Sequence, residues 1–195
     1  MTHLPPSEGL RSDTRRSFLT RLAAGAAFLT LGRLGAALAA APGTTKAWTK
    51  NMALDITFTV ATQAGGRVKR PYVAVWMEDA QGNTVRNLTV WVQQNRRNPR
   101  WVAELRRWTR QNSDLLDTVS SATRNPGTYA VAWDGKTDRG AQAPQGTYYV
   151  CVETAREHGP YSLVREKLTV GNAAFKKALG ANNDIEAVNV SFARA

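Results

Sequence analysis

Apolar and polar side chains alternate along much of the chain after residue 47, and this pattern limits the fold more than any other. Leu54, Ile56 and Phe58 alternate with polar residues, and a period of two predicts a strand with one buried face. Six further runs are densely apolar or alternate, and they span 71–79, 84–92, 127–133, 146–154, 161–170 and 185–192. Turn residues such as Asn125-Pro126-Gly127 separate them. The sequence therefore predicts an all-β fold, an antiparallel β-sandwich.

One segment between these strands has a helical period instead. Asn98 is a favourable N-cap, Pro99 suits the first helical position, and Trp101, Leu105 and Trp108 then recur on one face. We therefore predict one inserted helix over residues 98–110. The arginines in and before it are Arg96, Arg97, Arg100, Arg106, Arg107 and Arg110. They form either a solvated basic face or a patch that attracts an anionic group.

The N-terminal segment predicts export. Arg15-Arg16 and Phe18-Leu19 precede a weakly apolar run, rich in alanine and glycine, that ends in small residues near Ala40. This pattern is typical of a twin-arginine signal peptide, which the twin-arginine translocase recognises. The alternative is a membrane-anchored helix. We assign residues 1–40 to the signal and expect residues 41–195 to form a single periplasmic domain.

The mature domain is expected to be basic. The whole chain has a net charge of +11, and removal of the signal leaves about +8. A basic domain attracts phosphates of several kinds, but an exported protein has little access to nucleic acid, so we expect no nucleic-acid partner.

Side chains that bind metals are scarce. Cys151 is the single cysteine and lies in an apolar run, which predicts a buried thiol and no intramolecular disulfide. His158 is the only histidine outside the signal. Asp134 and Asp138 are interspersed with basic residues, which argues against a calcium loop. We therefore expect no bound metal and no catalytic triad.

The segment Asp117-Thr118-Val119-Ser120-Ser121-Ala122-Thr123 resembles the target sequence of bacterial periplasmic flavin transferases. In those targets the pattern is Asp-x-x-Ser/Thr-Gly-Ala-Thr, and the last threonine receives FMN from FAD through the phosphate. Asp117, Ser120, Ala122 and Thr123 match this pattern, and Ser121 replaces the glycine. A threonine that enters another enzyme's active site needs small neighbours, and we predict that the segment forms a surface loop. The resemblance implies covalent FMN on Thr123 and a flavin transferase as partner.

A longer stretch resembles an uncharacterised family of periplasmic proteins that are often encoded beside PepSY-domain membrane proteins and flavin transferases. The shared motifs are Thr123, Pro126-Gly127, Trp133-Asp134-Gly135, Gly146-Thr147-Tyr148 and Arg156-Glu157-His158-Gly159. The resemblance implies an electron carrier, rather than an enzyme on its own, that serves a PepSY-type membrane reductase linked to iron reduction or uptake. Arg156 and His158 would then lie near the flavin ring or its phosphate. The alternative for His158 is a loop residue satisfied by nearby backbone.

The hairpin from Trp133-Asp134-Gly135 to Gly146-Thr147-Tyr148 is also similar to a hairpin of immunoglobulin-like domains in flagellar hook-cap proteins. This likeness implies an immunoglobulin-like sandwich and says nothing about redox function. The alternative function is an unmodified immunoglobulin-like binding module of a membrane transport or reductase system.

Overall fold

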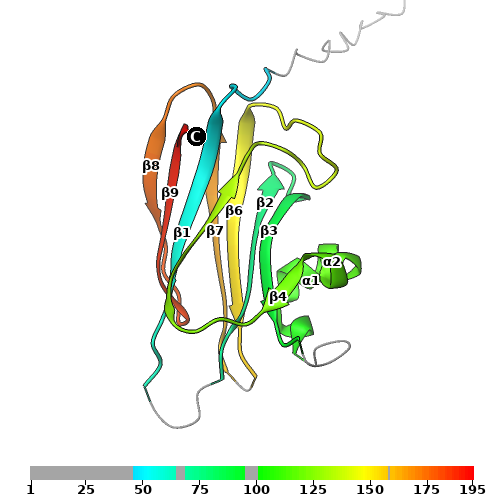
Figure 1. Cartoon of the computed structure of the whole chain (residues 1–195), viewed down its shortest axis with the longest axis vertical. Coiled ribbons are helices and arrows are strands. Elements are labelled where there is room, and N and C mark those ends of the chain that lie inside the picture. Colours follow the sequence, from blue (N-terminus) through cyan, green and yellow to red (C-terminus); the bar gives the residue numbers. More distant parts are fainter. Residues whose placement is uncertain (1–45, 65–68, 95–100, 158) are drawn as a thin grey trace, which may run out of the picture. The chain divides into compact units, whose positions relative to one another are not determined.

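The computed structural model describes residues 46–64, 69–94, 101–157 and 159–195, and it shows two β-sheets packed face to face (Figure 1). The strands are β1 (Met52–Val60), β2 (Tyr72–Asp79), β3 (Thr84–Val92), β4 (Ser120–Ala122), β5 (Gly127–Trp133), β6 (Gly146–Ala155), β7 (Tyr161–Val170), β8 (Phe175–Leu179) and β9 (Ile185–Arg194). Between β3 and β4 lie the helices α1 (Arg106–Asn112) and α2 (Leu116–Val119) and the 3-10 turns Val102–Glu104 and Ser113–Leu115.

The two sheets have the predicted antiparallel arrangement. One has the order β5-β1-β9-β8 and the other β4-β3-β2-β6-β7. Among the strand pairs of the described residues, only β3–β4 is parallel. The prediction of an all-β sandwich with a helical insertion is confirmed. The sequence did not predict β8, because this strand lies at a sheet edge and its five residues are half-buried or exposed. Lysines such as Lys176 and Lys177 are typical of exposed sheet edges.

The core lies between the sheets, and a second apolar cluster lies outside them. Leu54, Ile56 and Phe58 are fully buried in the main core, which confirms the period-two prediction for β1. The second cluster lies between the outer face of the five-stranded sheet and the helical segment, where Trp76 of β2 packs with Trp108 of α1. Because β2 is buried on both faces, its sequence reads as a continuous apolar run.

The inserted helix begins and ends later than the range 98–110 predicted for it. Residues 98–100 lie outside the described residues. Leu105 leaves helical geometry (φ −74°, ψ 70°), and α1 begins only at Arg106 and ends at Asn112. The cause is a tertiary contact, since the buried carboxylate of Glu153 accepts the backbone N–H groups of Arg107 and Trp108 at 2.8 Å each. An acceptor at that place satisfies the free donors of a first helical turn and so fixes where the helix begins.

The turn that follows β5 needs a glycine for two reasons. Gly135 has φ +78°, and a Cβ on it would lie 2.6 Å from the Trp48 ring. Trp48 in turn packs edge-on against Trp133, with the ring centroids 4.6 Å apart. The Trp-Asp-Gly motif thus joins a left-handed backbone position to close packing in the core.

We expect Gly135→Ala to lower the free energy of unfolding by about 3 kcal/mol, because backbone strain and overpacking add at this position. Gly140→Ala is the matched control, since Gly140 has φ +79° but a Cβ added to it would have no atom within 4 Å. In this control we expect the free energy of unfolding to fall by only about 1 kcal/mol, because backbone strain acts alone. Urea denaturation measures both variants, and equal losses would contradict the role of the Trp48 contact.

Candidate functional site

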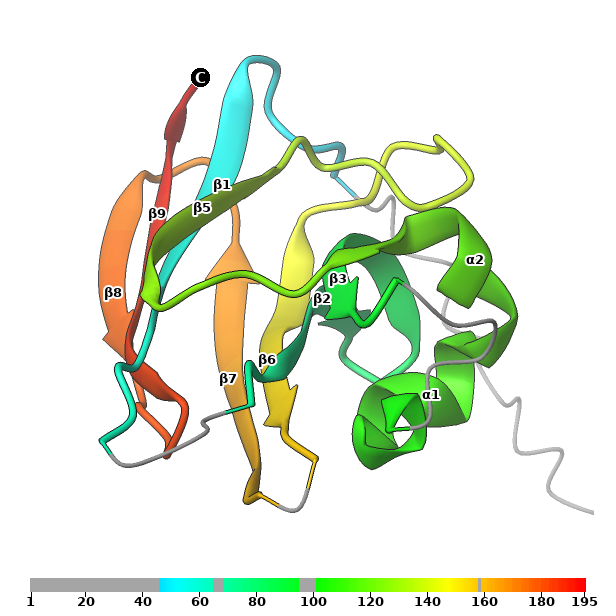
Figure 2. The ribbon, with the colours of Figure 1, turned by 60° about the horizontal axis from the view of Figure 1, so that its bottom comes forward.

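Thr123 lies where the chain leaves one sheet for the other. Ser121 of β4 pairs with Trp91 of β3, and the Thr123 N–H extends this pairing by donating to the Val92 carbonyl at 3.2 Å. The chain then crosses from the five-stranded sheet to β5 in the four-stranded sheet, as Figures 1 and 2 show.

The prediction of a surface loop over the whole target segment is wrong for residues 117–122. Asp117 lies in α2, and Ser120–Ala122 form β4. The cause is the edge of β3, whose free N–H and C=O groups accept a short partner strand. Thr123 itself follows the strand and has no regular secondary structure.

The residues of the target segment are all at least partly accessible to solvent. Asp117, Thr118 and Ala122 are exposed, and Ser120, Ser121 and Thr123 are half-buried. Two weak hydrogen bonds hold the serines: the Gln94 Nε2 donates to the Ser120 Oγ at 3.3 Å, and the Ser121 Oγ donates to the Val90 carbonyl at 3.3 Å. Because β4 is three residues long and is paired on one side only, a second protein can reach it from the free edge.

Arg124, the residue after Thr123, lies over two aromatic rings. The Arg124 guanidinium is 4.9 Å from the centroid of the Trp91 ring and 5.4 Å from that of Tyr129. The two rings meet edge to face at 4.8 Å, and the Tyr129 hydroxyl donates to the Asn125 carbonyl at 2.7 Å. The connection from β4 to β5 is therefore anchored on the aromatic edge of the core.

A hollow of about 190 Å³ lies beside the same connection. Asn125 and Pro126 line it, together with Lys69, Arg70 and other residues between β1 and β2. The Lys69 Nζ is 2.6 Å from the Glu157 Oε2. The region after β6 thus lies at the same end of the sandwich as this hollow.

Arg156 has a buried partner of its own. Its Nε lies 2.8 Å from the Asp184 Oδ1, and the Asp184 side chain is 1% exposed. Burial raises the pKa of Asp184, and the charge of Arg156 opposes this rise. The pair joins the end of β6 to the turn before β9. The role of Arg156 toward a flavin stays a prediction, and His158 lies outside the described residues.

Two buried carboxylates hold the helical segment that leads to Thr123. Besides the contact of Glu153 with the start of α1, Glu78 binds Arg107 of α1 through both carboxylate oxygens at 2.7 Å. The Glu78 Oε2 also accepts the Arg165 Nε at 2.8 Å. Burial alone would raise the pKa of Glu78, but its hydrogen bonds to the two arginines outweigh burial and hold the pKa below its usual value. Burial raises the pKa of Glu153.

Sequence reasoning missed both carboxylates, although a signal was present. Each is a charged residue in a densely apolar run, Glu78 within 71–79 and Glu153 within 146–154. A charge at such a position is almost never fully buried without a partner. The partners, however, come from elements far away in sequence and follow only from the fold.

The predicted basic patch is partly neutralised within the protein. Arg107 pairs with Glu78, and the Arg106 Nη2 lies 3.1 Å from the Glu104 Oε2. Arg110 is exposed on α1. The other three arginines of the patch, at 96, 97 and 100, lie outside the described residues.

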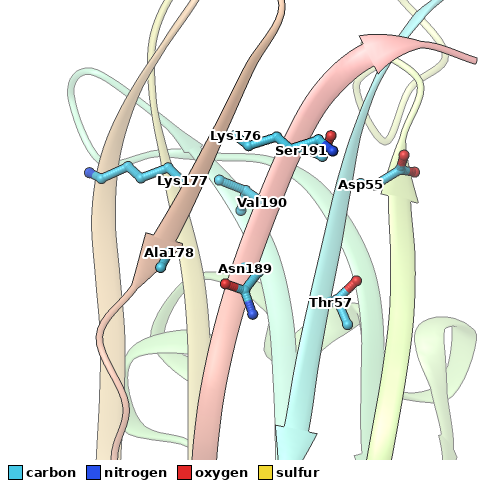
Figure 3. A pocket seen from close by; sticks show the side chains of 8 residues that line it. All are labelled: Asp55, Thr57, Lys176, Lys177, Ala178, Asn189, Val190 and Ser191. Carbon is cyan, nitrogen blue, oxygen red and sulfur yellow. The ribbon is translucent and has the colours of Figure 1, made fainter.

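A second, more open hollow lies on the outer face of the four-stranded sheet, away from Thr123 in sequence (Figure 3). It has a volume of about 360 Å³, and its lining side chains come from β1, β8 and β9. Most of the residues that line it are polar or charged, among them Asp55, Thr57, Asn189 and the neighbouring Lys176. None of them belongs to the predicted site.

Two features are absent from the described part of the chain. No helix there is long and apolar enough to cross a membrane. In the same residues, no three His, Cys, Asp or Glu side chains gather so that they could hold a metal ion. Cys151 is buried, and burial raises the pKa of its thiol.

The fold is a β-sandwich in which a short edge strand, β4, leads directly into Thr123. Residues 53–187 match a family described as "Predicted periplasmic protein (DUF2271)", and the chain belongs to this family. The match supports the prediction of an uncharacterised periplasmic family and of a periplasmic location. No curated protein and no solved structure matches the chain.

Proposed function

We propose that this protein carries FMN covalently on Thr123 and exchanges electrons with a PepSY-type membrane reductase, in a system linked to iron. A periplasmic flavin transferase attaches the group after export through the twin-arginine translocase. The observation that carries the proposal is the position of the target segment 117–123, which ends beside a sheet edge with the small residues Ser120–Ala122 directly before the acceptor threonine.

The residues around Thr123 fit a tethered flavin. Thr123 is half-buried as a residue, Arg124 after it supplies positive charge, and a hollow lined by Lys69 and Arg70 begins at Asn125, two residues further on. Positive charge near a flavin favours its reduced, anionic form. Bound FMN would supply one- and two-electron redox chemistry.

The attachment is a phosphoryl-group transfer that balances without an oxidant. The Thr123 hydroxyl oxygen attacks the phosphorus atom on the FMN side of FAD, and the bond from that phosphorus to the bridging oxygen breaks. AMP leaves with the bridging oxygen, and the hydroxyl proton passes to a base of the transferase or to water. The product is a phosphodiester between Thr123 and the flavin.

Peptide mass spectrometry tests the proposal directly. Trypsin releases residues 111–124, which contain the whole target segment. In protein produced together with an active periplasmic flavin transferase, this peptide is expected to gain the mass of FMN less one water. An unmodified peptide under those conditions would refute the electron-carrier function.

Export is tested separately through Arg15 and Arg16. Replacement of both by lysine is expected to stop processing, because the twin-arginine translocase reads the arginine pair itself and not only its charge. A precursor should then accumulate inside the cell, as an immunoblot of cell fractions would show. Normal amounts of mature periplasmic protein from this variant would contradict the export route.

The second candidate function is an unmodified binding module of a membrane transport or reductase system. The observation that favours it is the polar hollow on the four-stranded sheet (Figure 3), which requires no flavin. If the target peptide stays unmodified, this function replaces the first.

A further inference from the structure

Arg124 has an unusual position for an exposed arginine. It follows the acceptor residue directly, and its guanidinium lies over both the Trp91 and the Tyr129 rings. The hydrogen bond from Tyr129 to the Asn125 carbonyl fixes the backbone on the far side of Arg124, and the bond from the Thr123 N–H to Val92 fixes it on the near side. The backbone is therefore restrained on both sides of Arg124, and the two rings place its guanidinium.

The two ring contacts place the guanidinium and are neither hydrogen bonds nor ion pairs. An arginine that stacks on aromatic rings keeps its N–H donors in the plane, where they match two oxygens of a phosphate or carboxylate. Among the described residues, no carboxylate pairs with Arg124, whereas Arg106, Arg107, Arg156 and Arg165 each have one. Within the described part of the chain, the Arg124 side chain thus has neither a carboxylate partner nor a hydrogen-bond acceptor, and it directly follows Thr123.

We propose that Arg124 is the binding group for the phosphodiester that joins FMN to Thr123, a proposal that rests on the function proposed above. A phosphodiester has one negative charge and two unesterified oxygens, which a guanidinium binds through two parallel N–H donors. Trp91 and Tyr129 orient this guanidinium before the group arrives. Arg124 is thus a positioning residue that restrains the tether and limits the directions in which the flavin ring can point.

The experiment compares Arg124→Gln with Arg110→Gln in protein produced with the transferase. Both variants remove one positive charge from an exposed arginine, but only Arg124 is next to the acceptor. Intact mass spectrometry first measures loading with FMN, and this step tests the proposed function. The ³¹P NMR signal of the phosphodiester and the fluorescence anisotropy of the flavin then test the role of Arg124. Arg124→Lys keeps the charge but not the planar pair of donors.

In the loaded wild-type protein, the phosphorus signal is expected to be displaced from that of the flavin peptide released by trypsin. Arg124→Gln should lose most of this displacement and lower the anisotropy, Arg124→Lys should keep part of both, and Arg110→Gln should match the wild type. Loaded Arg124→Gln with wild-type signals would overturn this inference and leave flavin attachment intact. A wild-type protein that an active transferase does not load would overturn both proposals.

Discussion

Thr123→Ala is expected to abolish flavin attachment completely, because alanine has no oxygen to attack the phosphorus of FAD. Its cost in stability should be small. Thr123 is half-buried, and the bond that it makes to Val92 comes from the backbone N–H, which alanine retains. We expect the free energy of unfolding to change by about 1 kcal/mol or less. Intact mass spectrometry after production with the transferase, together with urea denaturation, measures the two effects.

Thr118→Ala is the matched control for this prediction. Thr118 is the other threonine of the target segment, and it is exposed on α2, five residues before the acceptor. Full loading is expected in this variant. FMN that moves to another hydroxyl in Thr123→Ala, such as Ser120 or Ser121, would show that the transferase recognises the strand as a whole rather than its last residue.

The strands that face the core were predictable because their physical signal is local. The alternation along β1 places Leu54, Ile56 and Phe58 on one face, and the fold buries that face against the second sheet. The turns at Gly82 and Gly135 have positive φ values, and glycine or asparagine at such positions is visible in the sequence. Such local patterns can be recognised without knowing which segment the strand packs against.

The start of the helix and the strand β4 were not predictable, because distant partners determine both. Asn98 and Pro99 are favourable N-terminal residues, yet α1 begins at Arg106, where Glu153 on β6 meets its first N–H groups. Ser120–Ala122 have no strand pattern and are paired because β3 offers a free edge. A sequence shows which residues can cap a helix or pair as a strand. Which distant carboxylate reaches the helix start, or which strand edge is free for pairing, is known only from the fold.

The candidate site likewise has one part that the sequence predicts and one part that only the fold shows. The residues from Asp117 to Thr123 follow from a motif. The arrangement of Arg124 over Trp91 and Tyr129 does not, because these three residues come from the two sheets and the connection between them. The sequence thus indicates the acceptor, whereas its surroundings depend on how the sheets pack.

Glu78→Gln is expected to lower the free energy of unfolding by about 3 kcal/mol at neutral pH, because removal of one partner leaves buried charges uncompensated. The Glu78 side chain is 1% exposed, and its oxygens accept hydrogen bonds from Arg107, Arg165 and the Trp76 Nε1. Glutamine has the same shape but no charge and only one acceptor oxygen. Since the two arginines keep about a quarter of their side-chain surface in water, we expect the low end of the range for buried pairs.

Glu166→Gln is the control for a charge change without burial. Glu166 pairs with Lys177 at 3.4 Å, and both side chains are more than 40% exposed. An exposed pair of this kind contributes about 1 kcal/mol or less. Urea denaturation of both variants at neutral pH therefore separates a buried network from a surface pair, and similar losses would contradict the anchoring role of Glu78.

The pH dependence of the free energy of unfolding is the sharper test of whether Glu78 is charged in the folded protein. Its pKa in the folded protein lies below the value in the unfolded chain, because the bonds from Arg107 and Arg165 outweigh the effect of burial. A carboxylate of this kind stabilises the protein above its unfolded pKa of about 4.3 and loses that contribution as pH falls through the folded pKa. The difference in unfolding free energy between wild type and Glu78→Gln should therefore be constant near neutral pH and shrink below about pH 4. Glu153 is present in both proteins, and Glu78→Gln leaves its carboxylate and its two backbone N–H donors in place. A difference that grows on acidification would mean that Glu78 is protonated in the folded protein and that the two arginines do not hold its charge.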